Sequence, residues 1–154
     1  MLEVGMAAPE ARVAVRPKEW AGLRELIGGR PALLLFFPFA FSSTCTEEMC
    51  AIADDWSGWS GLDAAVIGLS VDSPYVNVKF AESTNATFPI VSDFNREAIR
   101  AYDVVRPELN GLLEVAERTA FVIGRDGRIV YAWIGEHPGV MPPLAEIRDA
   151  LTRA

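Results

Sequence analysis

Cysteine, histidine and long apolar runs are scarce in this sequence. Its 154 residues include two cysteines and a single histidine, His137. Two cysteines do not make a disulfide scaffold in a chain of this length, and one histidine in the run Glu136-His137-Pro138 offers no cluster of metal ligands. No apolar stretch reaches the ~18 residues that a membrane span requires. We therefore expect no disulfide framework, no metal site and no membrane-embedded segment.

Basic residues are also in the minority. The chain has 14 Lys and Arg against 21 Asp and Glu, a net charge of −7. Binding to nucleic acid or to an anionic membrane needs clustered positive charge, so neither is expected. Met1–Gly5 has neither the basic start nor the apolar run of a secretory signal. The simplest expectation is a cytoplasmic protein that forms a single domain over residues 1–154.

Apolar runs separated by turn residues predict alternating strands and helices. The expected strands are Ala11–Val15, Ala32–Phe37, Ala64–Val71, Phe88–Ser92, Thr119–Ile123 and Ile129–Ile134. The expected helices are Glu19–Ile27, Cys45–Trp56, Tyr75–Ser83, Phe94–Tyr102 and a terminal helix with Leu144, Ile147 and Leu151 on one face. Arg106–Glu117 holds a proline and a glycine and is expected to be a loop, whereas Asp126-Gly127 is a strong hairpin signal.

This order predicts an α/β fold with a mixed central sheet. Strand–helix–strand units imply parallel neighbours with helices on both faces of the sheet. The chain then ends in a hairpin and a helix. The outline resembles that of a thioredoxin-like domain.

One cysteine occupies the junction between a predicted buried strand and a predicted helix. Cys45 follows the strand Ala32–Phe37 after a short polar segment, and Thr44 followed by Glu47 fits a capping box. Backbone N–H groups in the first helical turn lack intrahelical partners, and the helix dipole is positive there. The position therefore favours a thiolate over a thiol.

A thiolate at Cys45 also requires polar partners, because its surroundings are apolar. Met49, Ile52, Ala53 and Trp56 form an apolar stripe at helical spacing, and Cys45 projects near its base. Burial alone disfavours a charged sulfur, so hydroxyl donors and a cation must outweigh it. Ser42, Ser43 and Thr44 supply hydroxyls. Pro38 removes one backbone donor, and the expected cation is Arg118, which opens the strand Thr119–Ile123.

The run Pro38-x-x-x-Ser42-x-x-Cys45 resembles the peroxiredoxin signature, Pro-x-x-x-Thr/Ser-x-x-Cys. The resemblance extends to Glu48 and to Arg118, and further to the segments Val4-Gly5-x-x-Ala8-Pro9 and Phe88-Pro89-Ile90-Val91-Ser92-Asp93. It implies that the Cys45 thiolate attacks a peroxide oxygen and becomes sulfenic acid. Arg118, the Ser42 hydroxyl and backbone N–H groups would stabilise the charge on the departing oxygen, with Glu48 orienting Arg118. No metal, flavin or haem is implied.

Cys50 lies five residues after Cys45, the spacing of Q-type (bacterioferritin comigratory) peroxiredoxins. In that group the second thiol resolves the sulfenic acid as an intramolecular disulfide, which a thioredoxin- or glutaredoxin-type partner reduces. In an intact helix the two residues are separated by a rise of about 7.5 Å and point about 140° apart. A disulfide needs Cα atoms roughly 4.4–6.8 Å apart, so we expect the start of the helix to unwind when the bond forms.

Three alternatives stay open at this point. The chain is also similar to one-cysteine peroxidases of the alkyl hydroperoxide reductase E type, in which an outside thiol would resolve Cys45. A redox sensor would use the same Cys45 chemistry without turnover. A dithiol oxidoreductase is disfavoured because Cys45 and Cys50 lack the Cys-x-x-Cys spacing.

The aromatic residues Phe37, Phe39 and Phe41 flank the site. They are candidates for a dimer contact or for binding the tail of an organic hydroperoxide. Both a monomer and a homodimer stay open.

Overall fold

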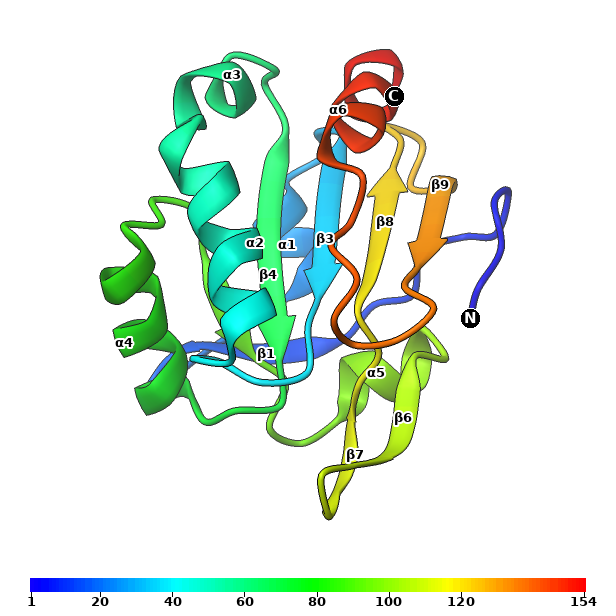
Figure 1. Cartoon of the computed structure of the whole chain (residues 1–154). Helices are drawn as coiled ribbons and strands as arrows, with labels where there is room; N and C mark the ends of the chain where they lie inside the picture. Colours follow the sequence, from blue (N-terminus) through cyan, green and yellow to red (C-terminus); the bar gives the residue numbers. More distant parts are fainter.

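A mixed sheet with helices on both faces forms the body of the protein (Figure 1). The computed structural model describes all residues, 1–154. The strands of the main sheet are β1 (Arg12–Arg16), β2 (Glu19–Gly22), β3 (Ala32–Phe36), β4 (Ala65–Ser70), β5 (Ile90–Ser92), β8 (Thr119–Ile123) and β9 (Ile129–Ile134). A separate hairpin consists of β6 (Val105–Leu109) and β7 (Leu112–Ala116). The helices are α1 (Leu23–Ile27), α2 (Ser43–Asp54), α3 (Trp56–Ser60), α4 (Pro74–Thr84), α5 (Glu97–Ala101) and α6 (Leu144–Arg153).

The central strand β3 shows why the sheet needs cover on both sides. All five of its side chains are fully buried, and they alternate between two hydrophobic cores. Leu34 and Phe36 join a core that includes residues of α1 and α5, whereas Leu33 and Leu35 join a core that includes residues of α2, α3, α4 and α6. A strand with apolar residues on both faces is stable only between two layers of helices.

The strand order of the main sheet is β2-β1-β5-β4-β3-β8-β9. β3 pairs in parallel with β4 and antiparallel with β8, and Phe36 at the end of β3 lies opposite Thr119 at the start of β8. The loop that leaves β3 and the residue that precedes β8 therefore meet at one edge of the sheet.

The structure confirms the predicted α/β fold with its mixed sheet, terminal hairpin and terminal helix, and it corrects several boundaries. The segment Glu19–Ile27, predicted to be a helix, divides into β2 and α1. The helix predicted at Cys45–Trp56 begins at Ser43 and ends at Asp54, where α3 follows. The helix predicted at Phe94–Tyr102 is reduced to α5. No helix is both long and apolar enough to cross a membrane.

The expectation of a loop at Arg106–Glu117 was wrong, because the segment forms the β6–β7 hairpin. Its turn is Asn110-Gly111, and both residues have positive φ angles, 55° and 84°. Asn-Gly favours this turn because both residues tolerate the left-handed region. The hairpin could be missed because its strands carry few buried side chains, so their apolar pattern is weak.

Candidate active site

Helix α2 begins earlier than its sequence suggests. Its N-cap is Ser42, so Cys45 is the third residue of the helix. The predicted capping box of Thr44 and Glu47 was therefore wrong, since Thr44 lies inside the first turn. The Ser42 hydroxyl does not cap the helix and instead donates to the Phe39 carbonyl at 3.0 Å. This bond closes the turn through which the chain enters α2.

The first turn of α2 presents free backbone donors. The first intrahelical bond runs from the Thr46 amide to the Ser42 carbonyl at 2.9 Å, and the amides of Ser43, Thr44 and Cys45 donate to no protein acceptor. These are the amides that every helix leaves unsatisfied at its start, and they lie at the positive end of its dipole. An anion or a polarised oxygen next to Cys45 would be stabilised there.

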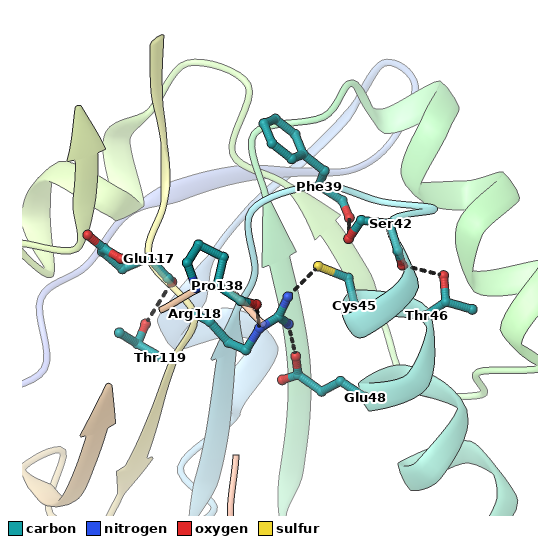
Figure 2. A network of polar contacts seen from close by, with 9 residues as sticks. All are labelled: Phe39, Ser42, Cys45, Thr46, Glu48, Glu117, Arg118, Thr119 and Pro138. Carbon is teal, nitrogen blue, oxygen red and sulfur yellow. Dashed lines mark hydrogen bonds and ion pairs between the residues drawn. The ribbon is translucent and has the colours of Figure 1, made fainter. Parts of the chain in front are cut away.

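The guanidinium of Arg118 connects the thiol to two other groups (Figure 2). Nη2 donates to the Cys45 sulfur at 2.8 Å, and Nε donates to the Pro138 carbonyl at 2.8 Å. Nη1 donates to the Glu48 carboxylate. A planar group held at three of its nitrogens has a fixed orientation. Arg118 is thus aimed at the sulfur before any substrate arrives.

The strand order of the sheet places Arg118 beside helix α2. Arg118 immediately precedes β8, and the antiparallel register places that strand's first residue opposite the end of β3. Cys45 and Glu48 are three residues apart on α2, so both side chains face the sheet from one side of the helix. All three side chains are buried: Arg118 is 2% exposed, and Cys45 and Glu48 are 0% exposed.

Glu48 is the unusual member of the group. One of its carboxylate oxygens, Oε1, is buried and has no hydrogen-bond partner. Burial raises the pKa of Glu48 to about 7, although Arg118 acts in the opposite direction. Desolvation is the larger effect, because only one oxygen of the carboxylate is compensated by a donor. The carboxylate of Glu48 therefore bonds to Arg118 through one oxygen only, and its burial opposes the charged form.

A small recess of about 160 Å³ leads toward this cluster. Its walls are the loop before α2, the first turn of α2, the tip of the β6–β7 hairpin and the loop after β9. The lining residues are Pro38, Phe39, Ser42, Ser43, Thr44, Leu109, Asn110, Arg118, Pro138 and Gly139. A larger cavity of about 430 Å³ lies between α1 and the β8–β9 turn and contains neither cysteine. The recess has the size of a very small substrate and is the only one of the two that reaches Arg118.

Sequence reasoning placed six of the ten lining residues at or beside the site and missed two features, the hairpin tip and the Pro138 carbonyl. The six are Pro38, Phe39, Ser42, Ser43, Thr44 and Arg118. The hairpin tip at Leu109 and Asn110 carried a readable signal, the Asn-Gly turn. The Pro138 carbonyl carried none, because every residue has a backbone carbonyl and only the fold shows which one meets Arg118. No group of three or more His, Cys, Asp or Glu side chains is placed to hold a metal ion.

The remaining predicted residues are distributed around the site. Cys50 is half-buried on α2, and both cysteines are free thiols. Of the three aromatic residues, Phe37 is fully buried in the core, Phe39 lines the recess, and Phe41 is 55% exposed with its ring 5.2 Å from that of Phe80.

A buried cysteine in the first turn of a helix, in contact with an arginine that lines a small recess, is the arrangement expected of a thiol-dependent peroxidase. The fold agrees with known members of that class. A solved peroxidoxin, BcpB from Mycobacterium tuberculosis, superimposes with a TM-score of 0.84 at 25% identity, over 99% of this chain and 97% of that one. A peroxiredoxin-like protein from Aquifex aeolicus gives a TM-score of 0.87 at 22% identity, over 99% and 87% of the two chains. The predicted thioredoxin-like fold is confirmed.

Sequence comparison identifies the family to which the chain belongs. The AhpC/TSA family profile matches residues 4–132, and the chain belongs to this family. It is 31% identical over 151 residues to alkyl hydroperoxide reductase E of Mycobacterium tuberculosis, covering 97% of this chain and 92% of that protein. It is 31% identical over 134 residues to peroxiredoxin Bcp of Bacillus subtilis, covering 86% and 85%. The protein is a peroxidase of the peroxiredoxin type.

Proposed function

We propose that Cys45 is the thiol that reacts with peroxide. Its thiolate attacks one oxygen of a hydroperoxide and breaks the O–O bond. The sulfur gives up two electrons and becomes sulfenic acid, and the other oxygen leaves as water or an alcohol after it takes up a proton. The observation that carries this proposal is the contact of 2.8 Å between Arg118 Nη2 and the Cys45 sulfur inside a buried site.

The surrounding donors suit the charge that develops in this step. As the O–O bond lengthens, negative charge moves onto the departing oxygen. Arg118 and the free amides of the first turn of α2 border the recess where that oxygen would lie. Because the Ser42 hydroxyl donates its hydrogen to Phe39, its oxygen is available to accept a hydrogen bond from the peroxide. Donors already in place stabilise the transition state without reorganising.

Pro38 and Glu48 act through position. Pro38 lines the recess and has no N–H group, so it presents an apolar wall to the peroxide. Glu48 fixes the plane of the guanidinium, as described above. Neither residue exchanges a proton or an electron with the substrate in this account.

We further propose that Cys50 resolves the sulfenic acid. Its thiolate attacks the Cys45 sulfur, expels the oxygen as water and forms an intramolecular disulfide. Two electrons and two protons from a thioredoxin- or glutaredoxin-type dithiol then return both thiols. Both cysteines lie within the single helix α2, where a rise of about 7.5 Å keeps them too far apart to bond. The first turns of α2 must therefore unwind during each cycle.

A coupled peroxidase assay with thioredoxin, thioredoxin reductase and NADPH tests both proposals. Cys45→Ser should abolish turnover of hydrogen peroxide and of cumene hydroperoxide. Cys50→Ser should abolish turnover with thioredoxin while leaving the first oxidation of Cys45 intact. Undiminished thioredoxin-supported cycling by Cys50→Ser would show instead that an external thiol resolves Cys45. Peroxidase activity of Cys45→Ser equal to that of wild type would contradict the assignment of Cys45 as the reacting thiol.

A further inference from the structure

The loop between β3 and α2 makes few hydrogen bonds to the rest of the fold. Residues 38–41 carry the chain from the sheet to the N-cap of α2 and thereby set where Cys45 lies. Within the turn, the amide and the hydroxyl of Ser42 both donate to the Phe39 carbonyl. One hydrogen bond alone ties this segment to another part of the chain: the Ala40 amide donates to Asp72 Oδ2 at 2.8 Å.

Asp72 is well placed to make that bond. It lies two residues beyond the end of β4, which is the parallel neighbour of β3. Parallel strands end at the same edge of a sheet, so the segment after β4 lies beside the loop after β3 (Figure 1). The Ser70 hydroxyl donates to the same oxygen of Asp72 at 2.7 Å. The Ser92 hydroxyl donates to the Asp72 backbone carbonyl at 2.6 Å.

A buried network holds these groups in turn. Ser70 and Asn77 are 0% and 1% exposed, and their side chains are hydrogen-bonded at 3.1 Å. The Asn77 amide also donates to the Val91 carbonyl at 2.9 Å. Strands β4 and β5 and helix α4 are thus connected to one carboxylate. Ser70 and Ser92 bond to Asp72 directly, whereas Asn77 is connected to it only through Ser70, so both direct bonds can form without Asn77.

The loop needs this support because its backbone is unfavourable. Phe41, directly before the N-cap, has a φ angle of 67°, a region that bulky side chains rarely adopt. Such a conformation persists only when its surroundings hold it in place. The turn itself is closed by the two bonds from Ser42 to the Phe39 carbonyl. Its contacts with other elements include the Ala40–Asp72 bond and the packing of the Phe41 ring against Phe80. Without the bond, the loop would relax and the first turn of α2 would shift against Arg118.

We propose that Asp72 is a positioning residue for the peroxidase reaction. It touches neither the thiol nor the peroxide. It acts by holding the Ala40 amide, and through it the free amides of α2 and the Cys45 sulfur, in line with the Arg118 guanidinium. The inference rests on the proposed reaction of Cys45, because it concerns the geometry of that step.

The test compares two variants of the same network. Asp72→Ala removes the acceptor of the Ala40 amide, whereas Asn77→Ala breaks the buried network but leaves that bond intact. For wild type and both variants, stopped-flow mixing with hydrogen peroxide gives the rate of Cys45 oxidation, and iodoacetamide gives its rate of alkylation. Each rate is taken as the plateau value reached at high pH, so that a difference in thiolate fraction does not enter the comparison. Alkylation needs a thiolate and access but no donors aimed at a peroxide. Urea unfolding of each variant measures the loss of stability.

Asp72→Ala should slow oxidation by peroxide roughly tenfold to a hundredfold, the range expected for misplacement by about 1 Å, and change alkylation by less than about threefold. Asn77→Ala should lose at least as much stability and keep the wild-type oxidation rate. Asp72→Asn retains an oxygen acceptor and should keep most of that rate. Equal slowing in Asp72→Ala and Asn77→Ala, equal slowing of both reactions, or no slowing in Asp72→Ala would overturn the inference. A wild-type Cys45 that does not react with peroxide would overturn the proposed function as well.

Discussion

The buried carboxylate next to Arg118 leads to a quantitative prediction about pH and stability. Glu48 has a pKa raised by burial from 4.5 to about 7. Between these two values the folded protein binds a proton at Glu48 that the unfolded chain has released. The contribution of Glu48 to the unfolding free energy therefore falls as the pH rises through this range. Glu48→Gln removes the titration and keeps a carbonyl oxygen that accepts from Arg118 Nη1.

The size of the effect follows from the same two values. At 1.36 kcal/mol per pH unit, the interval from 4.5 to about 7 corresponds to a loss of about 3 kcal/mol in unfolding free energy. The unfolding free energy of wild type minus that of Glu48→Gln should decrease by this amount from about pH 4.5 to about pH 8. Taking the difference cancels the other titrating groups that the two proteins share.

Urea unfolding of both proteins at several pH values and constant ionic strength measures this difference. A difference that stays constant with pH would show that Glu48 does not change its proton affinity on folding. A difference that increases with pH would show that the ion pair with Arg118 outweighs burial. Either result would refute the reasoning that desolvation dominates at this site.

Three further predictions concern the reaction itself. Arg118→Lys keeps the positive charge but loses the guanidinium group, whose nitrogens reach Cys45 and Pro138 together. Peroxide oxidation of Cys45, measured by stopped flow, should therefore slow roughly a hundredfold or more. Arg106→Lys, on β6, is the matched control and should keep the wild-type rate. Ser42→Ala should slow the same step roughly tenfold, whereas Ser42→Thr, which keeps the hydroxyl, should not; equal rates in both would remove Ser42 from the mechanism. In Cys50→Ser, peptide mapping after one equivalent of peroxide should find Cys45 sulfenic acid that persists, and its rapid disappearance without added thiol would contradict the resolving role.

The sequence was most informative where side chains are buried on both faces of the sheet. Ala32–Phe37 and Thr119–Ile123 were predicted correctly within one residue, because uninterrupted apolar runs have few alternatives to a covered strand. The Asp126-Gly127 turn was visible for a similar reason: it separates two such runs. The start of α2 was misjudged, because several residues in Ser42–Glu47 suit an N-cap and their own preferences do not choose among them.

Other contacts of the site are made by backbone groups, and the residue type at such a position does not predict the contact. The Pro138 carbonyl fixes Arg118, and the Ala40 amide binds Asp72. Any residue would supply a carbonyl, and almost any would supply an amide, so the sequence carries no sign of either bond. What the sequence does carry is the side chains at the centre, Cys45 and Arg118, whose types are specific to the chemistry.

The most direct test of the account is rapid-quench mass spectrometry after mixing the reduced protein with one equivalent of hydrogen peroxide. The account predicts that oxygen appears first on the Cys45 sulfur and is lost as a Cys45–Cys50 disulfide forms. In Arg118→Lys the first of these events should be delayed and their order unchanged. Oxygen appearing first on Cys50, or on Cys45 at the same rate with and without Arg118, would contradict the central claim that this arginine prepares this thiol for peroxide.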